Sequence, residues 1–293
     1  MDLRAIGMGL AFAFMWSSAF TSARIIVADA PPITALAIRF LISGLIGVAI
    51  ARALGQSWRL TGAQWRATVL FGFCQNALYL GLNFVAMQTI EASLAAIIAS
   101  TMPLWVALAG WLLVGERLRP LGVFGLLAGI AGVVIIMSAR LSGGVDLFGV
   151  MLAGTGVLAL TFATLAVRGA TSGGNVLMVV GLQMLVGSAS LAVAGLMLES
   201  WQVNWTWQLG VAFAYTTLVP GLLATWVWFT LVNRIGAVRA ATFHFLNPFL
   251  GVMIAAVLLG EALGPRDMLG VAVIALGILA VQWSKRAPKL QRV

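Results

Sequence analysis

Long apolar stretches alternate with short polar connections along the whole chain. Ten of these stretches approach the roughly 20 residues that a helix needs to cross the hydrocarbon of a bilayer. The connections carry helix breakers such as Pro31-Pro32, Pro120 and Gly264-Pro265. The pattern predicts ten transmembrane helices, over residues 5–27, 33–53, 67–88, 92–114, 121–139, 147–167, 176–198, 208–231, 238–259 and 267–284. No polar stretch leaves room for a soluble domain, so we expect an all-α polytopic membrane protein.

A set of residues recurs after 145 positions without a gap. Pro103, Gly115-Glu116, Leu118, Pro120, Gly125 and Gly132 return as Pro248, Gly260-Glu261, Leu263, Pro265, Gly270 and Gly277. The offset is half of the 293-residue chain, which predicts two five-helix repeats, 1–145 and 146–293. Because each repeat has an odd number of spans, the second is inverted relative to the first. Two inverted repeats predict alternating access, in which a central site is exposed to each side in turn.

Composition and charge agree with this architecture. The chain is 62% hydrophobic, 9% charged and has a mean hydropathy of +1.06, whereas soluble domains carry about 25% charged residues. The net charge of +9 is dispersed between apolar stretches, so we expect contact with membrane lipid and no nucleic-acid partner. With both termini inside, all Lys and Arg residues except Arg24, Arg39, Arg140 and Arg266 fall on the inner side. The positive-inside rule then predicts cytoplasmic N- and C-termini.

The first predicted span shares features with a cleaved signal peptide, namely Arg4, an apolar run and the triplet Ala28-Asp29-Ala30. The run 5–27 is longer than the apolar core of a signal peptide and is long enough to cross the membrane. We therefore expect it to be retained as the first span.

Several motifs resemble those of a known transporter superfamily. Trp16-Ser17-Ser18-Ala19-Phe20 resembles the W-G-x-x-F pattern of drug/metabolite transporters, with Ser17 in place of the usual glycine, and Arg39-Phe40 resembles their R-F pair. Pro103 followed by Leu113–Leu118, and Pro248 followed by Leu258–Leu263, resemble two copies of the ending of the EamA repeat. The resemblance covers nearly the whole chain and is strongest to ten-span exporters of aromatic amino acids of the YddG type.

The resemblance has four implications for this chain. It implies a location in the bacterial inner membrane and a central substrate cavity between two five-helix bundles. It places the fifth and tenth spans at the periphery of that cavity. It also implies export of aromatic or other large apolar amino acids, with export of other metabolites or drugs of the same superfamily as the alternative.

The third predicted span has a polar face. Gln75, Tyr79 and Asn83 recur every four residues, with Asn76 beside them, so on a helix they share one side. This face could hydrogen-bond the charged groups of an amino acid while Tyr79 stacks on its ring. The alternative is that these side chains only join helices, at about 0.6 kcal/mol per hydrogen bond.

The ninth predicted span carries His244, the single histidine, with Asn247 three residues later and Pro248 directly after. A proline inside a helix frees a backbone carbonyl and can kink the helix. Pro248 and its repeat counterpart Pro103 are therefore the candidate gating residues. The alternative is a histidine that is satisfied between helices and two tolerated prolines.

The remaining candidates are large apolar side chains and charged residues. The apolar wall of a pocket could be formed by Trp16, Phe20, Met102 and Trp105, although ordinary packing is the alternative at each position. Arg39, a charge within a span, is expected to reach the interface or to pair with a carbonyl or carboxylate. Glu116 and Glu261 are expected to fix the turns at the ends of their helices. The predicted substrate-binding set is Trp16, Ser17, Gln75, Tyr79, Asn83, Ser100, Met102, Trp105, His244 and Asn247.

The absence of certain motifs from the sequence favours some classes of function over others. No P-loop pattern and no carboxylate deep in a span occur, which favours facilitated or gradient-driven movement of a small molecule without a cofactor. No second histidine or carboxylate lies at ligand spacing from His244, so no metal site is expected. An intramembrane hydrolase that pairs His244 with Ser17 or Ser100 is the alternative class, and a channel would need a ring of charges or carbonyls. We therefore expect a transporter and not an enzyme; its oligomeric state stays open.

Overall fold

The computed structural model describes residues 3–115, 119–166, 173–235 and 240–284. Every regular element among these residues is a helix. Within them, nine helices are long and apolar enough to cross a membrane, and Phe243–Leu259 adds a shorter apolar helix. The prediction of an all-α polytopic protein is therefore confirmed. The predicted motif residues Glu116–Leu118, together with Arg168, Arg239 and the basic residues after Ser284, lie outside the described residues.

Six predicted spans are single helices, and four are divided. The single helices are α1 (Leu3–Asp29), α2 (Pro32–Ala53), α7 (Pro120–Ser142), α8 (Leu147–Ala166), α9 (Val176–Leu198) and α14 (Pro265–Ser284). The third span is α3 (Gly62–Phe71), η1 (Gly72–Tyr79) and α4 (Leu80–Ala86), and the eighth is α10 (Trp207–Thr216), η2 (Thr217–Leu223) and α11 (Ala224–Ile235). The fourth span is α5 (Ala92–Ser100) and α6 (Met102–Val114), and the ninth includes η3 (Ala241–Leu246) and α13 (Asn247–Leu259).

Two π-helices lie at the same place in the two repeats. They are η1, which begins at Gly72, and η2, which begins at Thr217, the position 145 residues later. Pro220 lies inside η2 and has no N–H to donate, which favours the wider turn there; η1 contains no proline. π-helical turns are rare and often lie at functional sites. Their shared position indicates that the repeats match in backbone as well as in sequence.

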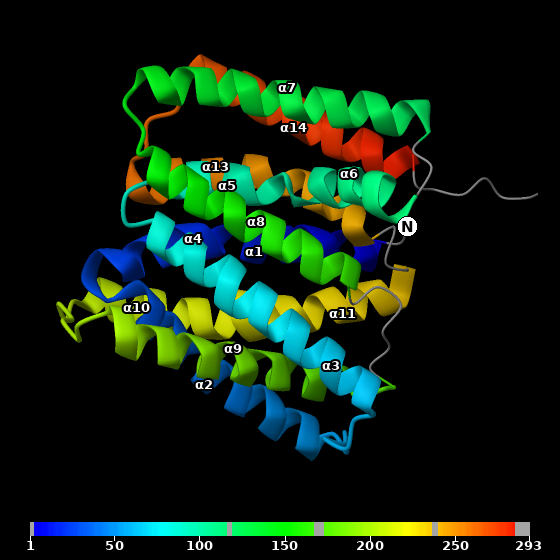
Figure 1. The fold of residues 1–293 in the computed structure, drawn as a ribbon, viewed down its shortest axis with the longest axis vertical. Helices are drawn as coiled ribbons and strands as arrows, with labels where there is room; N and C mark the ends of the chain where they lie inside the picture. Colours follow the sequence, from blue (N-terminus) through cyan, green and yellow to red (C-terminus); the bar gives the residue numbers. More distant parts are fainter. Residues whose placement is uncertain (1–2, 116–118, 167–172, 236–239, 285–293) are drawn as a thin grey trace, which may run out of the picture.

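The recurring glycines meet each other between α7 and α14. These helices lie side by side (Figure 1). A β-carbon on Gly125 would lie 2.6 Å from the carbonyl oxygen of Gly277, and one on Gly132 would lie 2.8 Å from that of Gly270. Only glycine allows so close an approach of two backbones. Because Gly125 is the repeat counterpart of Gly270, and Gly132 of Gly277, each repeat contributes the same surface to an antiparallel contact.

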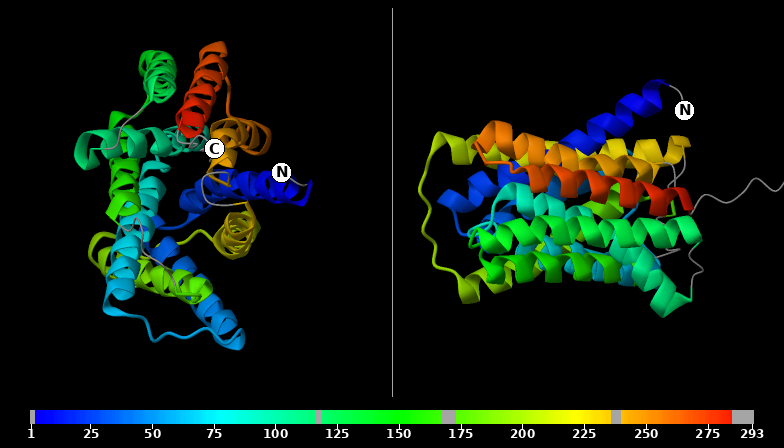
Figure 2. Two further views of the ribbon diagram at one scale, coloured as in Figure 1. Left: turned by 90° about the vertical axis from the view of Figure 1, so that its right-hand side faces the viewer. Right: turned by 90° about the horizontal axis from the view of Figure 1, so that it is seen from above.

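The two sequence halves are interleaved. Helix α1 packs mainly on α10, α11 and α13 of the second half, whereas α8 packs on η1, α4, α5 and α6 of the first half. We call the group α1, α10, η2, α11, η3 and α13 bundle I, and the group η1, α4, α5, α6 and α8 bundle II. The pair α7–α14 lies on one flank and the pair α2–α9 on the other (Figure 2).

The two ends of the molecule differ in charge. Helix α1 begins and α14 ends at the same end (Figure 1); we call it the basic end because Arg4, Arg52, Arg59 and Arg66 lie there. The opposite end carries Asp29, Glu91, Asp146, Glu199, Glu261 and Asp267 and is called the acidic end. The sequence predicts that the acidic end faces outward.

The Gly260-Glu261 pair has a different role from the expected one. Helices α6 and α13 end at Gly115 and Gly260, which adopt left-handed φ values of 73° and 68°. The glycine therefore makes the helix-end turn. The expectation that Glu261 fixes this turn is wrong, because its carboxylate accepts hydrogen bonds from the backbone N–H groups of Ala92 and Ser93, at the start of α5. Glu116 lies outside the described residues.

Candidate functional site

A small cavity of about 30 Å³ lies between bundle I and bundle II. Bundle I contributes Trp16, Phe20, His244 and Asn247, and bundle II contributes Tyr79, Ala99, Ser100, Met102, Pro103 and Leu160. The sequence therefore predicted seven of these lining residues as binding or gating groups, from four separate spans. Helices α7 and α14 contribute no lining residue, as expected for the peripheral fifth and tenth spans.

His244 lies in an aromatic surrounding inside bundle I. The ring centroid of Phe12 is 5.3 Å away, that of Trp228 is 5.1 Å away and that of Trp16 is 6.3 Å away, and all three contacts are edge-on. The amide nitrogen of Asn247 lies 2.9 Å from Nδ1 of His244. Because an amide nitrogen only donates, this contact makes Nδ1 the acceptor and places the ring proton on Nε2. The imidazole is thus held in one orientation at the cavity wall.

Asn247 offers a free acceptor at the cavity. Its side chain is buried, and its Oδ1 atom has no hydrogen-bond partner among the described residues. A buried amide oxygen without a partner is costly. The hydroxyl of Ser17 donates to the backbone carbonyl of Asn247 at 3.4 Å, so Ser17 supports the turn before Pro248. The arrangement leaves Oδ1 available to an N–H group of a bound solute.

The predicted polar face of the third span is divided. Tyr79 lines the cavity and is 2% exposed. Asn83 is buried, donates to the carbonyl of Tyr79 at 2.8 Å and does not line the cavity. Asn76 donates to the carbonyl of Gln183 on α9 at 2.9 Å, so it joins helices. Gln75 is half-buried and lies outside the cavity.

The break between α5 and α6 borders the cavity. The hydroxyl of Ser100 donates to the carbonyl of Ala96 at 2.6 Å, and Pro103 occupies the first turn of α6. Pro248 occupies the same position in α13. Proline is favoured at the first turn of a helix because its missing N–H would have no partner there. Trp105 lies further along α6, is 41% exposed and does not line the cavity.

Arg39 is satisfied inside the protein. Its Nε donates to the carbonyl of Thr216 at 3.2 Å, and its guanidinium lies 4.9 Å from the centroid of the Phe40 ring. Thr216 directly precedes the π-helix η2. The expected pairing with a carbonyl is therefore confirmed, and the structure places Arg39 outside the central cavity.

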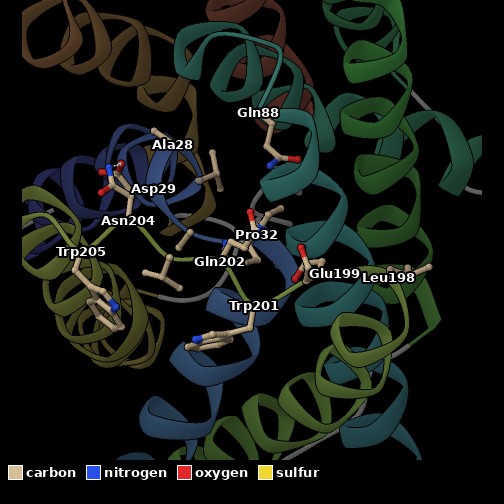
Figure 3. Close-up of a pocket in the computed structure, with 15 residues that line it drawn as sticks. Ala28, Asp29, Pro32, Gln88, Leu198, Glu199, Trp201, Gln202, Asn204 and Trp205 are labelled. Atoms are coloured by element: carbon tan, nitrogen blue, oxygen red, sulfur yellow. Dashed lines mark hydrogen bonds between the residues drawn. The ribbon is translucent and has the colours of Figure 1, made fainter.

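The acidic end contains the larger spaces. A vestibule of about 1050 Å³ lies between the α1–α2 corner and the segment 198–205; Figure 3 shows Asp29, Gln88, Glu199 and Trp201 around it. A second space of about 490 Å³ is lined by Arg24, Glu91 and Glu261, among others. Asp29 accepts hydrogen bonds from the side chains of Asn204 at 2.9 Å and Thr206 at 2.8 Å.

Asp146 lies at the same end, outside the spans. Its carboxylate accepts from the hydroxyl of Thr89 at 2.6 Å and from the backbone N–H of Gly149 at 3.0 Å. These bonds lower the pKa of Asp146 below its ordinary value of 3.8. Among the residues that the structure describes, no group of three or more His, Cys, Asp or Glu side chains could hold a metal ion.

Sequence reasoning missed two residues of this region. Leu160 lines the cavity from α8, and Phe12 packs behind His244. Both are apolar residues in apolar helices, so nothing in the sequence distinguishes them from lipid-facing neighbours. Ala99 also lines the cavity, and its repeat counterpart is His244; the sequence marks this difference between the repeats as a place where substrate chemistry is expected.

Several known proteins of similar sequence are named as transporters. The chain is 27% identical over 276 residues to the uncharacterized transporter YvbV of Bacillus subtilis, covering 94% of this chain and 90% of that protein. It is 25% identical over 293 residues to the uncharacterized inner membrane transporter YedA of Escherichia coli, covering 97% and 92%. It is 34% identical over 118 residues to the aromatic amino acid exporter YddG of Ancylobacter novellus, which covers 39% of each chain.

The fold and the repeats have their own counterparts. A solved crystal structure superposes with a TM-score of 0.67 at 23% identity, covering 97% of this chain and 99% of the other. The model of the EamA-like transporter family matches twice, at residues 3–138 and 147–283. Together these two matches span most of the chain. The chain therefore belongs to the EamA-like transporter family and is a multi-pass membrane transporter.

Proposed function

We propose that this transporter exports small amphipathic metabolites, in particular aromatic or other large apolar amino acids, across the bacterial inner membrane. One observation carries the proposal: the central cavity joins the rings of Trp16, Phe20 and Tyr79 to the free amide oxygen of Asn247. Aromatic rings bind an apolar side chain or another ring, and the oxygen can accept from an ammonium group. The hydroxyl of Tyr79 can donate to a carboxylate.

Alternating access of the two inverted repeats, 1–145 and 146–293, is the proposed mechanism. A cavity of about 30 Å³ corresponds to the share of one water in liquid, so an amino acid enters only after bundles I and II have separated. Helices α6 and α13 begin at the cavity with Pro103 and Pro248, and these positions are the proposed hinges. The termini lie in the cytoplasm, and the acidic end faces outward, as basic-residue placement favours.

Two alternatives can be weighed against this geometry. Export of other metabolites or drugs would use the same rings without requiring an ammonium group at Asn247. For a hydrolase, Ser17 or Ser100 would have to pair with His244. Their hydroxyls donate instead to the carbonyls of Asn247 and Ala96, so no observation favours the enzyme.

Efflux from liposomes tests the substrate class. Purified protein is reconstituted in liposomes loaded separately with labelled phenylalanine, tryptophan, leucine or lysine, and release is compared with protein-free liposomes. We expect release of the first three and little of lysine. Release of none of the aromatic or large aliphatic amino acids would contradict the proposal.

A matched pair of tryptophan variants tests the site. Trp16→Ala removes a lining ring and is expected to slow efflux at least about tenfold, because a buried aromatic contact contributes one to several kcal/mol. Trp105→Ala removes an equal ring that is 41% exposed and outside the cavity, and is expected to keep transport. Equal effects of the two variants at equal expression would remove the cavity from the mechanism.

A further inference from the structure

The corner between α4 and α5 is held from both sides by bundle I. This corner, residues Met87–Glu91, belongs to bundle II and lies at the acidic end. From α1, the guanidinium of Arg24 donates to the backbone carbonyl of Met87, the C-cap residue of α4. From the end of α13, the carboxylate of Glu261 accepts from the N–H groups of Ala92 at 2.8 Å and Ser93 at 2.9 Å.

The charges match the helix ends that they contact. The N-terminus of a helix carries partial positive charge and the C-terminus partial negative charge. Glu261 places an anion at the start of α5, and Arg24 places a cation at the end of α4. The residue in the N-cap position of α5, Glu91, makes no side-chain cap of its own. A residue of the other repeat therefore supplies the missing cap.

Helices of the two bundles also pack closely near this corner. Helices α5 and α13 lie against each other, and a β-carbon on Gly251 would lie 2.5 Å from that of Ala96. The space of about 490 Å³ at the acidic end is lined by both Arg24 and Glu261. The contact between α5 and α13 thus lies between this outer space and the central cavity.

Glu199 makes bonds of the same chemistry at a different place. Its carboxylate accepts from the N–H groups of Ile33 and Thr34, each at 2.8 Å, and so caps α2 from the end of α9. Helices α2 and α9 pack along each other and form one flank. This bond does not join bundle I to bundle II, which makes Glu199 a matched control for Glu261.

We propose that Arg24 and Glu261 form a clamp that closes the acidic-end mouth of the transporter and must release the α4–α5 corner for the cavity to open there. The inference rests on the alternating access proposed above. The clamp breaks and reforms in each cycle, whereas the cap by Glu199 stays intact. Removing either clamp charge therefore favours the state that is open at the acidic end.

Distance measurement between two spin labels tests the clamp without measuring transport. In a Cys74→Ser background, labels replace Trp207 at the start of α10 and Phe148 at the start of α8, which are 74% and 62% exposed. These sites report on bundle I and bundle II at the acidic end. We compare the protein carrying only the label substitutions with Glu261→Gln, Arg24→Gln and Glu199→Gln in lipid nanodiscs.

We expect Glu261→Gln and Arg24→Gln each to raise the ratio of long to short distances by about tenfold, the equivalent of about 1.4 kcal/mol and the lower range for a charged hydrogen bond. Glu199→Gln is expected to leave the ratio unchanged. Unchanged ratios in both clamp variants would overturn the proposal. If Glu261→Gln does not fold, Arg24→Gln tests the same corner alone. A shifted ratio in a protein that exports no amino acid would retain the clamp and reject only the substrate.

Discussion

Replacing Gly277 by alanine inserts one methyl group into the crossing of α7 and α14. The new β-carbon would lie 2.6 Å from the carbonyl oxygen of Gly125 and 2.7 Å from the backbone nitrogen of Gly129. Both are backbone atoms, so no side chain can rotate away. The helices must separate by about 0.8 Å to reach the ordinary contact distance of 3.4 Å. We expect a loss of about 1–3 kcal/mol, the usual cost of overpacking.

Thermal unfolding in detergent at a fixed scan rate measures this loss. For a chain of this size, 1 kcal/mol corresponds to about 2 °C, so Gly277→Ala is expected to lower the midpoint by about 2–6 °C. Gly210→Ala is the control, because nothing lies within 4 Å of a β-carbon there and alanine favours the helix. Equal midpoints for the two variants would refute the close glycine contact and, with it, the antiparallel pairing of the repeats.

Three further predictions concern single contacts. Ser188→Ala removes the hydroxyl that donates to the carbonyl of Ala37 at 2.8 Å; unfolding midpoints should show a loss of about 0.6 kcal/mol, with efflux unchanged. Asn247→Ala should weaken the apparent affinity for an exported amino acid about tenfold by removing the free acceptor, and an unchanged affinity would exclude an ammonium site there. The hydrogen bonds to Asp146 lower its pKa, so its contribution to stability is present above about pH 3.8 and is lost as pH falls through the folded-state pKa. Asp146→Asn should therefore flatten the decline of the unfolding midpoint below pH 4. Identical declines in the variant and the unchanged protein would contradict this role.

The spans could be predicted because they follow from strong local constraints, whereas the inversion of the second repeat stays a prediction. A backbone in hydrocarbon must satisfy its hydrogen bonds within a helix, so long apolar stretches between breakers leave little choice. The sequence shows that the glycines recur. It does not show that Gly125 lies against Gly277, because this contact depends on how α7 and α14 cross. The interleaving of the halves is likewise a property of long-range packing, which the hydropathy pattern does not encode.

Part of the candidate site could also be predicted from the sequence. Trp16, Tyr79, His244 and Asn247 are polar or aromatic groups within apolar spans, and the structure brings them to one cavity. Asn83 and Asn76 have the same character, but their amide nitrogens donate to the carbonyls of Tyr79 and Gln183, and neither residue lines the cavity. A sequence shows that a buried polar side chain needs a hydrogen-bond partner. It does not show whether that partner is a neighbouring backbone carbonyl or a solute in the cavity. The π-helices were not predicted, because η1 has no residue that marks it.

Because the two halves are interleaved, each half depends on the other for its packing. Since α1 finds its partners in the other half, a single half inserted alone would leave its first span without the surface against which it packs. A half-length chain that inserted in both directions would recreate the same contacts as an antiparallel homodimer. Separate expression of 1–145 and 146–293 should accordingly yield two fragments that are stable only together. In one continuous chain, each repeat has a single orientation in the membrane. The two repeats can therefore differ at equivalent positions, such as Ala99 in the first and His244 in the second.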